Sequence, residues 1–306
     1  MPPQPLPDRS AHDSLYRDTL SPLAATRSPE AYCAAYEARH LSPYWTGGRP
    51  KGFVSGMATR ALQASAERLG LPRERIRVLD AACGQGELSV YLACRGFHVV
   101  GVDISREGCR AAERLARQVR AGTPEGGACR FIAASLETLP LPEESVDFVI
   151  GHAALHHFIK YPGVSAEFAR VLRRGGMGFF ADSFGENVLF RAFHDKARMA
   201  RLGDVMLTDA KIRAFFPQFA VDLVPTDWFT MLDKLYERLL GRRLRRLRRR
   251  LSRLHFGLDR RVPVRSRFAL ACSGSVMTVI RKDIRAPALH RGADSAGVAS
   301  RPEQRP

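Results

Sequence analysis

Short apolar segments alternate with amphipathic segments of helical length between residues 76 and 182. Each apolar segment is rich in Val, Ile, Leu, Ala or Phe, which is typical of strands buried on both faces of a sheet. Strands that alternate with helices in this way predict an α/β fold built on a parallel, doubly wound sheet. The predicted strands are Ile76–Ala81, Phe97–Val102, Arg130–Ala134, Val146–Gly151 and Met177–Asp182.

The chain beyond Asp182 predicts the rest of a seven-stranded, mostly parallel sheet. A capped helix is expected over Thr208–Phe216, followed by a sixth strand at Ala220–Val224. The last strand is expected within Phe268–Arg281, and a helical insertion at 225–264 precedes it.

Residues 28–75 predict a helical cap before the first strand. Ser28 is a helix N-cap residue with Pro at the next position. Tyr36 and Trp45 in this cap either pack against the sheet or stack on a substrate. The predicted organisation is a disordered leader at 1–27, the cap at 28–75, the main domain at 76–282 and a disordered tail at 283–306.

The end of the first strand carries the most informative motif. The segment Val78–Glu87 reads as a strand that stops in a glycine turn and enters a helix directly. Gly84 and Gly86 allow the backbone to approach a ligand closely, because they have no Cβ. Asp103 follows the second strand, where a carboxylate accepts hydrogen bonds from two ribose hydroxyls. The pattern predicts a nucleoside site at the carboxyl ends of these strands.

Two residues distinguish between the cofactors that such a turn serves. The dinucleotide fingerprint has a third glycine where this chain has Ser89. Asp80 places an anion at the end of the first strand, which suits a cationic sulfonium and repels a pyrophosphate. S-adenosylmethionine is therefore the predicted cofactor.

The chain here resembles the class I S-adenosylmethionine-dependent methyltransferases, in particular the type 11 group of small-molecule and lipid-quinone methyltransferases. The matching segments lie in the family's order across roughly 105 residues. They are residues 78–87, 99–104, 134–141, 146–158 and 172–180.

The resemblance implies a set of cofactor-binding residues. Asp80 and the backbone of the turn are expected to hold the methionine part, Asp103 the ribose, and Ile104 one face of the adenine. Ser135 and Leu136 are expected at the adenine edge. The predicted residues are Asp80, Ala82, Cys83, Gly84, Gly86, Asp103, Ile104, Ser135 and Leu136.

Two of these positions depart from the family pattern. Ala82 stands where Gly is frequent, and its small side chain is expected to be tolerated. Ser135 stands where an Asp usually accepts from the adenine amino group. Either Glu137 or a water takes part of that role, or Ser135 merely ends the third strand.

His152 is the predicted catalytic residue. It directly follows the fourth strand, at the family position that faces the transferring methyl group. It is expected to act as the base or to orient the substrate, and the alternative is a histidine bound to backbone at a strand end. His156 and His157 are interpreted as helix-start and packing residues. No metal is predicted, because no carboxylate or Cys lies at ligand spacing in the sequence beside them.

Composition sets the class of protein. A chain of 306 residues with 45% hydrophobic content can bury a large core. It contains no run of about 18 apolar residues that would span a membrane, and its first residues have no signal-peptide core. Six scattered cysteines are typical of reduced thiols, so a cytoplasmic location is expected.

The net charge of +17 is concentrated in one region. Between Lys234 and Arg267 there are 14 basic residues and two acidic ones. Leucines spaced three and four apart within 242–258 predict an amphipathic helix with a cationic face. The helix is a solvated cap, or contacts an anionic membrane or lipid-like substrate, or binds RNA. The absence of interleaved aromatic residues argues against nucleic acid.

The sequence thus predicts an enzyme that methylates a small, partly apolar metabolite. The alternatives are an RNA methyltransferase that uses the Arg-rich segment 242–253, a membrane-surface lipid or quinone methyltransferase, and a non-catalytic cofactor-binding protein. The sequence leaves open the methyl acceptor, the acceptor atom and the oligomeric state.

Overall fold

The computed structural model describes most of the predicted main domain and cap. The described residues are 13, 16, 21, 23, 25–41, 52–119, 127–186, 203–226, 247, 250 and 273–283. The expectations for Trp45, for the insertion beyond residue 226 (247 and 250 apart) and for the tail beyond residue 283 lie outside the described residues. Among the described residues, no helix has the length and apolar character needed to cross a membrane.

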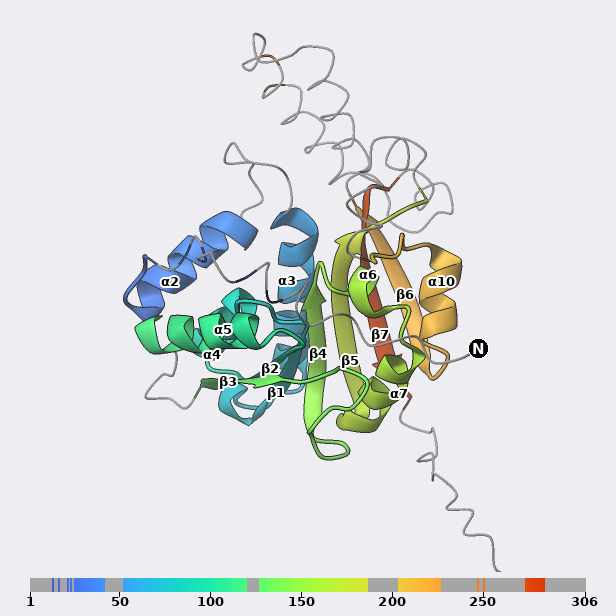
Figure 1. Cartoon of the computed structure of the whole chain (residues 1–306), viewed down its shortest axis with the longest axis horizontal. Coiled ribbons are helices and arrows are strands. Elements are labelled where there is room, and N and C mark those ends of the chain that lie inside the picture. The colour runs from blue at the N-terminus through green and yellow to red at the C-terminus, as the bar shows by residue number, and fades with distance from the viewer. Residues whose placement is uncertain are drawn as a thin grey trace, which may run out of the picture.

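The core is a seven-stranded sheet in the order β3-β2-β1-β4-β5-β7-β6, which confirms the predicted fold class (Figure 1). The first five strands pair in parallel, and β7 runs antiparallel to both β5 and β6. Strand order reverses between β1 and β4, and the carboxyl ends of strands at such a switch point are where ligands bind in open α/β sheets. The strands are β1 (Arg77–Ala81), β2 (His98–Asp103), β3 (Ala128–Ala133), β4 (Val146–His152), β5 (Leu172–Ser183), β6 (Phe219–Thr226) and β7 (Ser275–Lys282).

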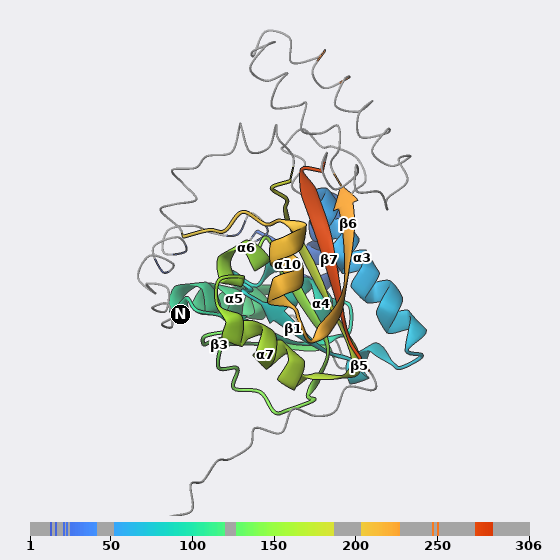
Figure 2. The ribbon, with the colours of Figure 1, turned by 90° about the vertical axis from the view of Figure 1, so that its right-hand side faces the viewer.

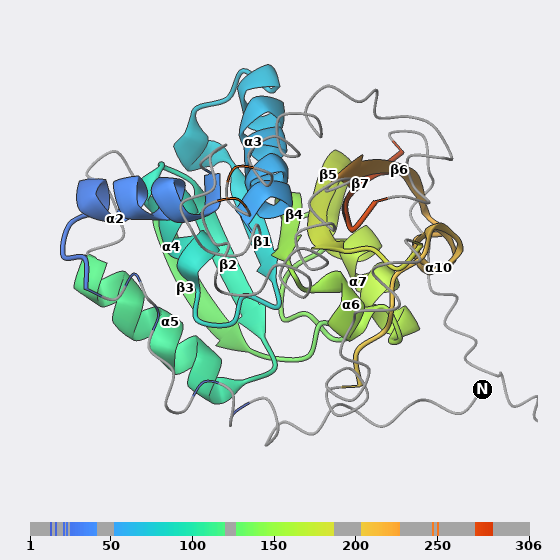
Figure 3. The ribbon, with the colours of Figure 1, turned by 90° about the horizontal axis from the view of Figure 1, so that it is seen from above.

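Helices cover both faces of the sheet. One face carries α2 to α5, and the other carries α6, α7 and α10; Figure 2 shows α3 and α10 on opposite sides of β7, and Figure 3 shows the same layers from above. The helices are α2 (Pro29–Tyr36), the π-helix η1 (Glu37–Leu41), α3 (Gly52–Arg68), the 3₁₀ turn η2 (Arg73–Arg75), α4 (Glu87–Cys94), α5 (Arg106–Val119), α6 (Leu155–Phe158), α7 (Pro162–Val171) and α10 (Asp209–Phe215).

The two-residue period of the strands divides the core into two clusters. Val78 and Ile150 pack with the α2–α5 layer, whereas their neighbours Leu79 and Val149 pack with the α6, α7 and α10 layer. All four side chains are buried. Because both faces of β1 and β4 are covered, polar side chains on these strands are most readily accommodated at the carboxyl edge.

Several strand and insertion boundaries differ from those predicted. β5 begins at Leu172 rather than Met177, because Leu172 pairs with Val146 across a register shift in β4. β6 continues through Thr226, two residues into the expected insertion, and Pro225 lies within it. β6 is an edge strand, where a missing backbone N–H is tolerated.

The predicted helix caps are confirmed. The side chains of Ser28 and Thr208 accept from the backbone of α2 and α10 respectively. Ser105 accepts from the Gly108 N–H at 3.0 Å at the start of α5. These bonds satisfy backbone donors in the first turn of each helix.

The described positions of the segment predicted as a disordered leader contact the main domain. Asp13 Oδ1 accepts from the Ser105 hydroxyl at 2.6 Å and from the Glu107 N–H at 3.2 Å. Leu23 is buried in the core. A carboxylate at the amino end of α5 is favoured by the helix dipole, which gives these contacts a physical reason that composition alone does not reveal.

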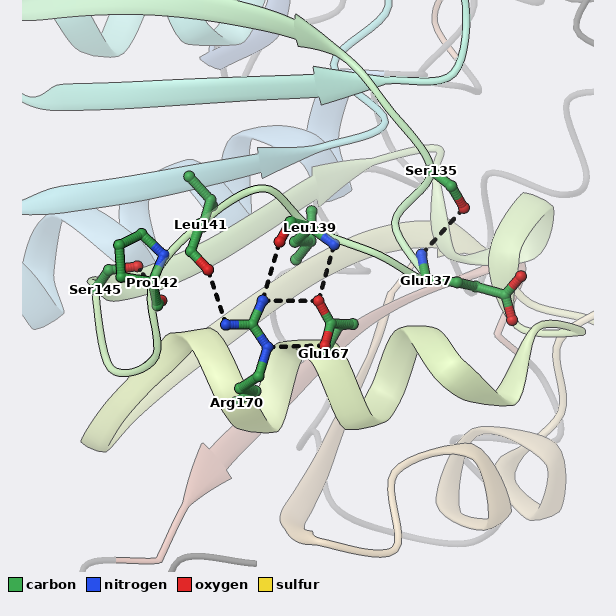
Figure 4. Close-up of polar contacts among 8 residues, drawn as sticks. All are labelled: Ser135, Glu137, Leu139, Leu141, Pro142, Ser145, Glu167 and Arg170. Carbon is green, nitrogen blue, oxygen red and sulfur yellow. Dashed lines mark hydrogen bonds and ion pairs between the residues drawn. The ribbon is translucent and has the colours of Figure 1, made fainter. Parts of the chain in front are cut away.

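An ion pair on α7 holds the loop that joins β3 to β4 (Figure 4). The Arg170 guanidinium donates to the Leu141 carbonyl at 2.8 Å and to the Leu139 carbonyl at 3.0 Å. Glu167, which pairs with Arg170 at 2.8 Å, accepts from the Leu139 N–H at 2.8 Å. The pair therefore satisfies the backbone of the loop at three points.

We expect Arg170→Leu to lower the free energy of unfolding by about 2–3 kcal/mol, because it leaves a nearly buried carboxylate and two carbonyls without their partner. The matched control is Arg110→Leu on α5, where the Arg110–Glu107 pair is 64% and 31% exposed. That control is expected to change stability by less than about 0.5 kcal/mol. Urea unfolding measures both, and equal losses would contradict the assignment.

Candidate functional site

The turn after β1 is a tight loop with left-handed backbone. Gly84 has φ of 53° and Gly86, which precedes α4, has φ of 73°. Ala82 also has a positive φ, 57°. A left-handed alanine costs about 1 kcal/mol, so Ala82 is accommodated in the turn at the expense of some backbone strain.

The two glycines of the turn serve different purposes. A Cβ on Gly86 would lie 2.6 Å from Ala112 Cβ and 2.7 Å from Phe131 Cε1. Packing between α4, α5 and β3 therefore requires glycine at position 86, whatever ligand the turn holds. A Cβ on Gly84 would meet the Tyr16 hydroxyl at 2.9 Å.

Tyr16 is a site residue that the sequence did not indicate. Its ring lies against Gly84 and Gly108. Burial and the nearby Asp103 carboxylate raise the pKa of its phenol well above the usual range. No pattern marks Tyr16 in the sequence, because it belongs to a segment that composition describes as a disordered leader.

Asp103 joins the turn after β1 to the turn after β2. Its Oδ2 accepts from the Gly84 N–H and its Oδ1 from the Ser105 N–H, both at 2.8 Å. The side chain is buried. The carboxylate therefore links the backbone of the two turns.

Asp80 is a buried carboxyl at the end of β1, with 2% of its surface exposed. Burial raises its pKa to about 7, although the Ser89 hydroxyl, which donates to Oδ2 at 2.7 Å, acts in the opposite direction. Ser89 stands where a dinucleotide fingerprint has its third glycine. Its hydroxyl gives this position a role that glycine cannot fill.

The backbone of Cys83 is engaged within the turn. Its N–H donates to the Val102 carbonyl at 3.1 Å, and its carbonyl accepts from the Gly86 N–H at 2.9 Å. A hydrogen bond with Cys109, together with burial, raises the pKa of the Cys83 thiol. Cys83 therefore stabilises the turn and its thiol stays protonated.

The residues expected at the adenine follow β2 and β3. Ile104 is half-buried, and Leu136 is half-buried against the core. Ser135 Oγ accepts from the Glu137 N–H at 3.2 Å, so Ser135 shapes its own turn (Figure 4). The Glu137 carboxylate lies against Gly163 at the start of α7.

The helical cap covers the glycine turn through Glu87 and an aromatic stack. Glu87 pairs with His40 at 3.2 Å and accepts from the Ser21 hydroxyl at 2.5 Å. Tyr36 stacks on Tyr91 with ring centroids 4.3 Å apart. The Tyr36 ring thus packs in the core, while burial and then the Asp80 carboxylate raise the pKa of its hydroxyl.

His152 ends β4 with its Nε2 at 3.3 Å from the Thr59 hydroxyl of α3. Thr59 donates its proton to the Ser55 carbonyl at 3.0 Å, so the network assigns the ring proton to His152 Nε2. This leaves the lone pair on Nδ1. Burial, and then the charge of His40, lower the pKa of His152 to about 3, so the ring is neutral at physiological pH.

The histidines after β4 have acidic neighbours from distant parts of the chain. His156 Nδ1 lies 2.5 Å from Asp182 Oδ1, and His157 Nδ1 lies 2.6 Å from Asp204 Oδ1. No carboxylate lies at ligand spacing beside these histidines in the sequence, but the fold brings two carboxylates to them. Asp182 and Asp204 are 26 and 47 residues away in sequence, so spacing along the chain did not reveal them.

Comparisons with known proteins agree with this geometry. Residues 79–180 match the sequence model of a family described as "Methyltransferase domain". The chain is 37% identical over 102 residues to the ubiquinone/menaquinone biosynthesis C-methyltransferase UbiE of Syntrophotalea carbinolica, covering 33% of this chain and 40% of that protein. It is 28% identical over 178 residues to a malonyl-[acyl-carrier protein] O-methyltransferase of Enterobacter lignolyticus, covering 56% and 67%.

Among solved structures, the fold is similar to geranyl diphosphate C-methyltransferase from Streptomyces coelicolor. The TM-score is 0.52 at 14% identity, covering 90% of this chain and 97% of that one. The chain spans 20% to 67% of the length of the first curated relatives that it matches. Residues 79–180 match the family's sequence model, and they lie in a seven-stranded sheet of the expected strand order. They therefore belong to the type 11 group of class I, S-adenosylmethionine-dependent methyltransferase domains.

Proposed function

We propose that the protein is an S-adenosylmethionine-dependent methyltransferase that acts on a small, partly apolar metabolite. The observation that carries the proposal is the pair of buried carboxyls, Asp80 and Asp103, on either side of the glycine turn. The relatives are named for quinone, malonyl-[acyl-carrier protein] and phthiotriol substrates, which supports a metabolite or lipid acceptor.

The residues present fit the cofactor chemically. Asp103 places a buried carboxylate beside the glycine turn, and carboxylate oxygens accept hydrogen bonds from hydroxyls such as those of a ribose. Asp80 offers a buried negative charge to the cationic methionine part. Ile104 would pack on the adenine, with Ser135 and Leu136 at its edge. When bound, the cofactor supplies an electrophilic methyl group on a positively charged sulfur.

His152 is proposed to orient the acceptor. Its neutral ring has a lone pair on Nδ1, which can accept a hydrogen bond from an acceptor hydroxyl or amine. The low pKa makes His152 a weak base. Its contribution therefore comes mainly from holding the attacking atom in line with the methyl group.

The position of the helical cap favours a small methyl acceptor that the protein encloses over a macromolecular one. Tyr36, His40 and Thr59 come from three elements that lie over the carboxyl edge of β1 and β4. A cytoplasmic location remains part of the proposal. RNA binding and membrane contact both depend on 242–258, of which the structure describes only residues 247 and 250.

Two measurements test the function. Calorimetric titration should show binding of S-adenosylhomocysteine and no binding of NAD, and the opposite result would end the proposal. A labelled-methyl assay against metabolite and lipid extracts should then yield a labelled small molecule. Label in RNA would favour the nucleic-acid alternative, and cofactor binding without any product would favour a non-catalytic protein.

Asp103→Ala should weaken S-adenosylhomocysteine binding 10- to 100-fold, which corresponds to about 1.4–2.7 kcal/mol, because the ribose loses its charged acceptor. Asp103→Asn should weaken it similarly, since the amide retains only one acceptor oxygen for two N–H groups and two hydroxyls. Calorimetry on variants with native circular dichroism measures both. Unchanged affinity in both variants would contradict the ribose assignment.

Cofactor affinity should depend on pH through Asp80. The carboxyl has a pKa of about 7 in the free protein, and a bound cation lowers it. Below pH 7 a proton must leave on binding, so S-adenosylmethionine affinity should fall towards tenfold per pH unit as pH drops, and should be constant above pH 7.5.

Calorimetric titration with S-adenosylmethionine from pH 5.5 to 8.5 tests this prediction. Repeating it in buffers of different ionisation enthalpy reports the proton that is released on binding. Asp80→Asn should remove the dependence, and S-adenosylhomocysteine, whose sulfur is uncharged, should show a smaller slope. A flat affinity profile for the wild-type protein would refute the role of Asp80.

His152→Ala should lower kcat about 10- to 100-fold by loss of orientation, with cofactor affinity within twofold of the wild type. Thr59→Val, which removes only the group that fixes the ring tautomer, should give a smaller loss. Rates are measured at saturating cofactor with the acceptor found in the extract assay. If the wild-type rate depends on a histidine that titrates near pH 6.5 and this dependence disappears in His152→Ala, the neutral assignment is wrong.

A further inference from the structure

We propose that His156, His157 and Asp204 form a binding site for a divalent transition-metal ion of the Zn²⁺ type. The proposal rests on the geometry of these side chains and is independent of the proposed methyl transfer. His156 and His157 lie on α6, directly after β4. Asp204 comes from the segment that precedes α10.

The three side chains place donor atoms around one point. One nitrogen from each histidine and a carboxylate oxygen of Asp204 all lie within 4.8 Å of one another. Bonds of about 2.0–2.2 Å to a tetrahedral ion separate donor atoms by about 3.4 Å. Small side-chain rotations therefore suffice to close the set around an ion.

The distance between His156 and Asp204 is better suited to a bridging ion than to a direct bond. His156 Nε2 lies 3.9 Å from Asp204 Oδ2. This separation is too long for a hydrogen bond between the two atoms. It is close to the separation of two donors on one metal ion, so the pair faces each other across a gap of the right size.

Asp182 sets the orientation of the first ligand. Its Oδ1 lies 2.5 Å from His156 Nδ1, and its Oδ2 accepts from the Leu155 N–H at 3.2 Å. The Asp182 side chain is 1% exposed. A carboxylate that holds one ring nitrogen leaves the other nitrogen with its lone pair, which is the arrangement behind most metal-binding histidines.

Backbone bonds hold the two parts of the site together. The Val205 N–H donates to the His156 carbonyl at 2.9 Å, and the Gly185 N–H donates to the Leu207 carbonyl at 2.8 Å. Asp204 is thereby fixed beside α6, and its carboxylate is 9% exposed. The site is therefore largely formed before an ion binds.

The local charge suits a dication. Asp182 and Asp204 contribute two negative charges, and Lys160, which donates to the Gly203 carbonyl, contributes one positive charge. The hydrogen bond from His157 to Asp204 at 2.6 Å would be exchanged for two metal bonds. Imidazole nitrogens with a carboxylate favour Zn²⁺ and similar ions over Mg²⁺ or Ca²⁺, which prefer oxygen alone.

The site lies at the carboxyl edge of the sheet on the side of α6, whereas His152 at the same edge contacts α3. His152 pairs with Ala181 across β4 and β5, so Asp182 is the next residue along the same edge. Three protein ligands leave a fourth position open to water or a substrate oxygen.

The test is calorimetric titration of the chelator-treated full chain with ZnCl₂, and absorption spectroscopy with CoCl₂, whose visible bands report nitrogen ligands. One ion per chain is expected, with a rise in the unfolding temperature on Zn²⁺ addition. His157→Ala and Asp204→Asn should each weaken Zn²⁺ binding at least 100-fold. Asp182→Asn, which loses only the orienting charge, should weaken it 10- to 100-fold.

His98→Ala is the matched control, because His98 is an exposed histidine at the start of β2. The Zn²⁺ affinity of the His98→Ala variant should equal that of the wild-type protein. Circular dichroism establishes that each variant is folded, and His157→Gln replaces His157→Ala if the latter is not. Absence of Zn²⁺ binding to the wild type, or equal affinity in the wild type, His157 and Asp204 variants, would overturn the proposal.

Discussion

The hydrogen bonds of Asp103 hold the candidate site in one shape. One oxygen accepts from the turn after β1 and the other from the turn after β2. One buried carboxylate thereby adds to the pairing of β1 with β2 and to the bond from the Cys83 N–H to the Val102 carbonyl. Charged acceptors form stronger bonds to N–H groups than neutral ones, so Asp103 holds the two turns at a fixed separation.

Asp80, the second buried carboxyl of the candidate site, has a different set of hydrogen bonds. Its carboxyl is as buried as that of Asp103, but the hydrogen bonds that oppose the effect of burial come from Ser89. Burial outweighs these bonds and raises its pKa to about 7. Asp103 thus joins the backbone of two turns, whereas the charge of Asp80 is one that a cationic ligand can stabilise. A doubly wound sheet allows this division because its covered strands leave their polar residues at the carboxyl edge.

The sequence predicted those parts of the protein that depend on local periodicity. The alternation of strands and helices gave the sheet, and Ser28, Ser105 and Thr208 gave the helix starts. It also brought Asp80 and Asp103 to one edge, because both follow parallel strands. It did not predict the length of β5, which depends on a register shift against Val146, nor the need for glycine at Gly86, which depends on Phe131 from another strand.

Long-range contacts explain what the sequence missed at the site. Tyr16 and Asp13 belong to a segment whose composition indicates disorder, yet each contacts a turn some 70 to 90 residues further along the chain. The two histidine environments show the same limit. His152 is neutral because α3 and His40 enclose it. His156, four residues later, is oriented by a carboxylate that arrives from β5. His152 and His156 thus have different environments, one enclosed by α3 and one beside a buried carboxylate, because of partners that no local pattern encodes.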